Sequence, residues 1–145
     1  MKTKALAQTI AGQCVAVQVR KLNRAVTNIY DEELRAHGLT VGQINILVAV
    51  AQFGEATPRE IGANLLLEKS TLSRSLKLMI KNGWLEAACS EAGRKQSVAL
   101  TKAGEKLLAA AAGSWAKAQG RAKEMIGKTN LATLFETTRS LKEKI

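Results

Sequence analysis

The chain has 145 residues, of which 46% are hydrophobic and only 3% aromatic, with a single proline. This composition excludes an intrinsically disordered chain and favours a helical domain over a β-sandwich or barrel. The formal net charge of +10 indicates a polyanionic partner, either nucleic acid or an anionic membrane surface. The number of Lys and Arg residues minus the number of Asp and Glu residues is +3 over residues 1–36, −1 over 37–56, +4 over 57–102 and +4 over 103–145. The charge therefore belongs to folded structure and not to a basic tail.

Other classes of protein are excluded by what the sequence lacks. Two cysteines and one histidine are too few for a disulfide framework or a structural metal site. No Ser–His–acid pattern or glycine-rich phosphate loop is present, so we expect neither an enzyme nor a cofactor. The first residues, MKTKALAQTIAGQCVAV, imitate a signal peptide, but Gln8, Thr9 and Gln13 interrupt the apolar region. No apolar run is long enough to span a bilayer, which predicts a cytoplasmic protein without a membrane partner.

The N-terminal third predicts one long helix. Apolar residues recur at spacings of three and four from Val15 to Ile29, and Ile10, Cys14 and Val17 widen the stripe. Gly38 suits the left-handed cap at its end.

Two capping boxes predict the next two helices. Thr40 and Gln43 open the first, over VGQINILVAVAQFG. Thr57 and Glu60, with Pro58 at the first helical position, open a second and shorter one.

A fourth helix is predicted over residues 69–81, closed by Asn82 and Gly83. At 100° per residue, one face is apolar and the opposite face is polar and cationic. The predicted inner face consists of Leu72, Leu76, Met79 and Ile80, and the outer face of Ser70, Arg74, Lys77 and Lys81.

WLEAACS and QSVAL have the length of two strands of a hairpin. Thr101 then begins a helix with Leu107, Leu108, Ala111 and Trp115 on one side, and Asn130 is predicted to cap a last helix. The order predicts a mainly α fold, a winged helix-turn-helix with a small β-hairpin wing and N- and C-terminal dimerisation helices. We expect an N-terminal dimerisation helix (1–36), a DNA-binding domain (37–102) and C-terminal dimerisation helices (103–145).

The outer face of the fourth helix predicts contact with DNA. It carries no acid between residues 69 and 81, and its first turn offers the small hydroxyls of Ser70, Thr71 and Ser73. Hydroxyls bond phosphates and base edges, and a helix fits the major groove of B-DNA. The alternative is an ordinary solvated amphipathic helix.

The turn between the two strands adds a second cationic feature. Residues 91–95 place Arg94 and Lys95 side by side at the tip of the hairpin. An arginine there could enter a narrow minor groove, where the potential is most negative. The alternative is an exposed tip with ordinary charges.

Three stretches in order, YDEELRAHGLTVGQINIL, TPREIGANLLLEKSTLSRSLKLMIKNGWLE and GRKQSVALTKAGEKLL, resemble the MarR family of bacterial transcription regulators over about residues 14–127. The resemblance implies a homodimer in which the terminal helices interlock and two winged helices bind a pseudo-palindrome in double-stranded DNA. It also implies that Thr71, Ser73 and Arg74 face the major groove and Arg94 the minor groove. This chain has Ala92 where the family typically carries an aspartate that steadies that arginine.

The resemblance further implies release from DNA by a small anionic or phenolic effector. Tyr30, His37 and Trp115 are candidates to contact it, although each also suits ordinary core or interface packing. Some members of the family sense peroxides through a first-helix cysteine, which makes Cys14 a candidate redox residue; a buried cysteine is more often a small hydrophobe.

We therefore predict a sequence-specific, homodimeric transcription repressor. Three alternatives stay open: a thiol-based peroxide sensor acting through Cys14, a sequence-indifferent architectural DNA binder, and a winged helix used for protein contacts, which would tolerate neutralising Arg74 and Arg94.

Overall fold

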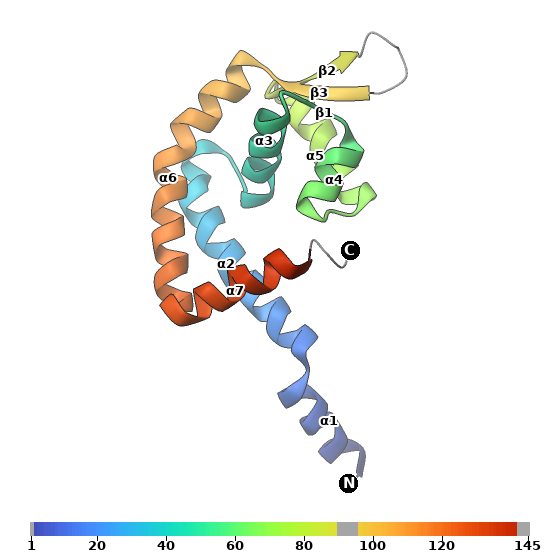
Figure 1. Cartoon of the computed structure of the whole chain (residues 1–145), viewed down its shortest axis with the longest axis vertical. Helices are drawn as coiled ribbons and strands as arrows, with labels where there is room; N and C mark the ends of the chain where they lie inside the picture. The colour runs from blue at the N-terminus through green and yellow to red at the C-terminus, as the bar shows by residue number, and fades with distance from the viewer. Residues whose placement is uncertain (1, 90–95, 142–145) are drawn as a thin grey trace.

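A computed structural model describes residues 2–89 and 96–141 of the chain (Figure 1). The helices are α1 (Lys2–Gln13), α2 (Val15–Leu34), α3 (Val41–Phe53), α4 (Pro58–Leu65), α5 (Lys69–Lys81), α6 (Lys102–Ile126) and α7 (Lys128–Leu141), with a 3₁₀ turn η1 (Arg35–His37). The strands are β1 (Glu55–Ala56), β2 (Leu85–Cys89) and β3 (Gln96–Leu100). This arrangement confirms the predicted winged helix-turn-helix fold.

The prediction of one long first helix is wrong at Cys14, where the backbone is extended (φ −69°, ψ 109°) and separates α1 from α2. No residue of α1 is buried, and the helix extends away from the rest of the molecule (Figure 1). Packing therefore does not hold the two helices in line, and Gly12 weakens the helix just before the break.

The predicted signals around α3 are confirmed. Gly38 adopts the left-handed conformation (φ 67°) after η1. Thr40 Oγ1 accepts from the Gln43 N–H at 3.2 Å, and Gln43 Oε1 accepts from the Thr40 N–H at 3.0 Å. The helix that follows supplies much of the core, with Leu47 and Val50 fully buried.

The sheet has three antiparallel strands in the order β1-β3-β2. The predicted hairpin is confirmed, with Leu85 opposite Leu100 and Ala87 opposite Val98. The sequence did not predict β1, whose Ala56 pairs with Val98 on the other edge of β3. A two-residue strand carries no periodic pattern and exists because β3 offers it a partner.

Long helices complete the molecule on one side. Thr101 caps α6 as predicted, and its Oγ1 accepts from the Gly104 N–H at 3.0 Å. The prediction that Asn130 caps the last helix is wrong: α7 begins at Lys128, and Asn130 Nδ2 donates to the Ile126 carbonyl at 3.0 Å. No described residue of α7 is buried.

No single helix within residues 2–89 and 96–141 is long and apolar enough to cross a membrane. The segments Val15–His37 and Val41–Phe53 meet those criteria only together, across a bend of 76°.

Candidate nucleic-acid interface

Helix α4 and the turn after it set the position of α5. The predicted capping box of α4 is present, with Thr57 Oγ1 accepting from the Glu60 N–H at 3.2 Å and Glu60 Oε2 from the Thr57 N–H at 2.8 Å. The helix ends at Leu66, the only non-glycine with positive φ (53°) in the described chain. This left-handed residue turns the backbone, and the Leu67 N–H closes the turn on the Gly62 carbonyl at 3.0 Å.

Helix α5 has the predicted bounds and anchors itself by one face. Leu72 and Leu76 are nearly buried and Met79 is fully buried. The prediction for Ile80 is wrong, since its side chain is 40% exposed. It lines a groove beside the strands, and the described residues leave it partly open to solvent.

The opposite face of α5 is entirely exposed to solvent and carries no carboxylate. It presents the predicted contact residues together with two further lysines: Lys69, Ser70, Thr71, Ser73, Arg74, Lys77 and Lys81. A helix anchored by one face and cationic on the other can enter a major groove without repacking.

The two strands β2 and β3 form the wing. Ser97, a buried polar residue of β3, donates from Oγ to the Ala88 carbonyl at 3.0 Å, which satisfies it inside the hairpin. The predicted minor-groove residues Arg94 and Lys95, together with Ala92, lie outside the described residues.

The base of the wing is joined tightly to α6. Thr101 Oγ1 donates to the Gly83 carbonyl at 2.6 Å, and the Thr101 N–H donates to the Trp84 carbonyl at 3.1 Å. A Cβ at Gly104 would lie 2.1 Å from the Trp84 oxygen. Glycine is therefore required for the end of α5, the wing and α6 to meet this closely.

A groove of about 740 Å³ lies between α4, α5 and the strands β2 and β3. Its cationic lining residues are Arg59, Lys69 and Lys77. Sequence reasoning singled out neither Arg59 nor Lys69. The signal for Arg59 was its place directly after Pro58 in the exposed first turn of α4, but only the tertiary structure places it near α5.

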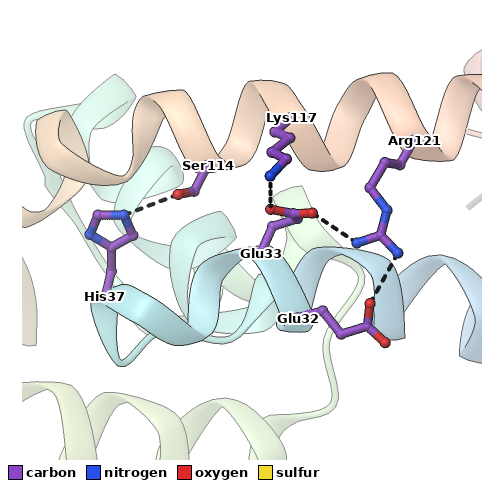
Figure 2. A network of polar contacts seen from close by, with 6 residues as sticks. All are labelled: Glu32, Glu33, His37, Ser114, Lys117 and Arg121. Carbon is purple, nitrogen blue, oxygen red and sulfur yellow. Dashed lines mark hydrogen bonds and ion pairs between the residues drawn. The ribbon is translucent and has the colours of Figure 1, made fainter.

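Helix α2 is held against α6 by polar contacts (Figure 2). Arg121 bridges two acids of α2, with Nη2 3.0 Å from Glu32 Oε2 and Nη1 2.9 Å from Glu33 Oε1. These hydrogen bonds raise the already high pKa of Arg121. Lys117 Nζ lies 3.6 Å from Glu33 Oε2. Because Lys117, Arg121 and Glu32 are exposed and only Glu33 is partly buried, these pairs fix the register of the two helices more than they stabilise the fold.

The structure does not bring the three predicted effector residues into one site. Tyr30 is buried and donates a hydrogen bond to Gln119 of α6, and burial raises its pKa. His37 Nε2 lies 3.1 Å from Ser114 Oγ (Figure 2). Trp115 is 42% exposed and lines a different space, between α3 and α6.

Cys14 is half-buried at the break between α1 and α2. Within the described residues no group of three or more His, Cys, Asp or Glu side chains could hold a metal ion.

The model of the MarR family matches residues 37–96, which include α3, α4, α5 and β2. An uncharacterised helix-turn-helix transcriptional regulator of Bacillus subtilis, YwoH, is 32% identical over 89 residues. That alignment covers 61% of this chain and 65% of YwoH, so the match spans just under two thirds of the relative.

Solved structures match the fold over most of the chain. A mutant of E. coli MarR in complex with operator DNA has a TM-score of 0.80 at 18% identity, covering 91% of this chain and 96% of that one. Bordetella bronchiseptica BpsR, described with the regulation of its DNA binding by 6-hydroxynicotinic acid, has a TM-score of 0.77 at 15% identity, covering 90% and 95%. The chain therefore resembles the MarR family in sequence over its winged helix, and it shares the fold of these solved structures over most of its length.

Proposed function

We propose that the protein is a sequence-specific DNA-binding transcription regulator and not an enzyme. It binds a pseudo-palindromic operator in double-stranded DNA as a homodimer, in the cytoplasm, and acts as a repressor. One observation carries this proposal: α5 is anchored by Leu72, Leu76 and Met79 and exposes a carboxylate-free cationic face. The chain is similar to a MarR protein solved on its operator, which supports the same use of this helix.

The site residues follow from the anchoring of α5. We assign the major-groove contacts to the exposed residues of its outer face: Ser70, Thr71, Ser73, Arg74 and Lys77. Arg94 and Lys95 are assigned to the wing tip on the sequence pattern, and the resemblance adds the minor-groove contact of Arg94.

Exposed apolar residues support the homodimer. Val15, Val19 and Leu22 of α2 are 74%, 60% and 40% exposed, and Phe135 of α7 is 52% exposed. These side chains form stripes on elements far from the sheet, as Figure 1 shows for the helices that carry them. A second copy of the chain would cover the stripes, with residues 1–36 and 103–145 as the dimerisation segments and 37–102 as the DNA-binding domain.

The test is fluorescence anisotropy of labelled duplexes. The protein is titrated into the DNA upstream of its own gene and into a scrambled duplex of equal length, at two salt concentrations. We expect the upstream DNA to bind far more tightly at the higher salt, because base contacts survive the screening that removes non-specific attraction.

Equal and steeply salt-dependent binding to both duplexes would instead indicate an architectural protein. Because an operator elsewhere would give the same result, a selection for bound sequences from a random duplex library completes the test. Failure to enrich any sequence contradicts the proposal.

The peroxide-sensing alternative is tested on the same duplex. If Cys14 is not a switch, peroxide will leave DNA binding of the wild type and of Cys14→Ser equally intact. Loss in the wild type alone would favour the sensor.

A further inference from the structure

A second groove, of about 690 Å³, runs between α3 and α6 on the side away from the polar contacts of α2. Helix α6 contributes residues spaced by three and four, so they share one face of the helix. The groove is lined by Ile44, Val48, Ala51, Gly54, Leu100, Glu105, Leu108, Ala109, Ala112 and Trp115.

Glu105 is the one charged residue among these lining residues, and the others are apolar. It lies in the first turn of α6, where the helix dipole favours a carboxylate. That role explains its position but leaves its charge without a counter-ion. Its side chain is exposed, and in the described parts of the chain no lysine or arginine forms an ion pair with it.

The charged and the aromatic side chain of the groove, Glu105 and Trp115, lie far apart along α6. Glu105 and Trp115 are ten residues apart on one helix, which corresponds to about 15 Å along its axis. A compact ion cannot touch both. A molecule that satisfies both carries a positive head beside Glu105 and an apolar body that lies over Leu108 and Ala112 and ends on the indole of Trp115.

We infer that this groove binds an elongated amphipathic cation. The inference rests on the proposed function, for which it names the class of effector. It differs from the anionic or phenolic class that the family resemblance implied, because the groove offers an anionic ligand no cationic partner. The apolar floor supplies most of the binding and the carboxylate selects the sign of the charge.

The groove also has a route to the DNA-binding elements. Leu100, at one end of it, is the last residue of β3, and the next residue, Thr101, joins the wing to α6. A ligand seated between α3 and α6 would therefore contact the last residue of the wing. The bound form is expected to hold the wing at a different angle and to weaken DNA binding.

A matched pair of ions tests the inference on the full-length protein. Decyltrimethylammonium and decyl sulfate, both below their micelle concentrations, are titrated by calorimetry without DNA. The net charge of +10 favours the anion everywhere else on the surface, so tighter binding of the cation requires a local acidic site. Hexyltrimethylammonium should bind more than about tenfold more weakly than the decyl cation, because it covers less of the apolar floor.

Two variants and one control locate the site. Glu105→Gln should lower the affinity for the decyl cation roughly two- to fivefold and leave that for decyl sulfate unchanged or higher. Glu124→Gln removes the same charge from an exposed position further along α6 and should change neither. Trp115→Ala should lower the affinity for the decyl cation. It should leave the affinity for the hexyl cation unchanged, because the shorter chain does not reach residue 115.

Equal or tighter binding of decyl sulfate to the wild type, or the same affinity in Glu105→Gln, would overturn the inference. So would the absence of any binding, which is expected if a second copy of the chain fills the groove. Anisotropy on the enriched duplex separates the two proposals. DNA binding that the cation does not weaken refutes the effector alone, whereas cation binding by a protein that selects no DNA refutes the proposed function.

Discussion

Tyr30 shows how one residue joins α2 to α6. It is the only tyrosine in the chain, it is buried, and its hydroxyl donates to Gln119 across the helix pair. Burial disfavours the phenolate and raises the pKa of Tyr30 above its ordinary value of 10.0. Well below pH 10 both the folded and the unfolded protein carry the neutral phenol. In that range Tyr30 therefore adds no pH dependence to the free energy of unfolding.

As the pH rises above 10, the unfolded chain loses the proton first and folding becomes less favourable. We therefore expect the free energy of unfolding to fall in this alkaline range. A Tyr30→Phe variant should show a smaller fall. Tyrosinate absorbance of the native wild type, which reports Tyr30 alone, should have a midpoint above 10, and a midpoint at or below 10 would contradict the assignment.

Gly104 shows a close approach of two backbones. Gly104→Ala places a methyl group 2.1 Å from the Trp84 carbonyl oxygen, so one of the two backbone segments must move. We expect a loss of about 1–3 kcal/mol in the free energy of unfolding, measured by urea denaturation.

Gly113→Ala is the matched control. It makes the same change in the same helix, where a Cβ meets nothing within 4 Å. Because alanine is the better helix former, this variant should gain about 0.5–1 kcal/mol. Equal effects at both positions would show that the contact with Trp84 does not constrain the helix.

Among the elements, α5 combines an anchor and a cationic face on thirteen residues. Arg74 lies in the exposed row, with the buried Leu72 and Leu76 fixing the rotation of the helix. Arg74→Ala should therefore remove a DNA contact without unfolding the domain. We expect a loss of about 1–3 kcal/mol in binding, together with weaker preference for the selected sequence, measured by anisotropy.

Arg139→Ala removes the same charge from the exposed side of α7 and is the control for net charge. It should lower affinity slightly and leave sequence preference intact. If both variants lose affinity equally and keep their preference, α5 does not read the bases.

The whole molecule leaves its apolar stripes on the terminal helices uncovered. Val19 is 60% exposed on α2, and a charge there would be buried in the proposed dimer. Val19→Glu should therefore convert a dimer to a monomer, with half the molar mass by light scattering. Leu78→Glu, at a residue 46% exposed on α5, makes the same kind of change outside the stripes and should remain dimeric. A wild-type protein that is monomeric at all concentrations would contradict the proposed homodimer.

Local chemistry in the sequence determined most of the helix ends and the winged helix itself. A capping box acts within four residues, so Thr40 and Thr57 were readable without the fold. The bounds of α5 were likewise set by its own stripe and by Gly83.

Only the tertiary structure decided features that depend on distant partners. Helix α1 separates from α2 because none of its residues is buried within the described structure, and β1 exists because β3 lies beside it. Ile80 has the spacing of a core residue, but the described residues leave it 40% exposed beside the groove. Glu105 and Trp115 face a common groove because α3 packs along α6, and periodicity describes only a residue's own helix. The sequence by itself therefore determined the elements and their faces, and the packing of those elements decided which faces remain open.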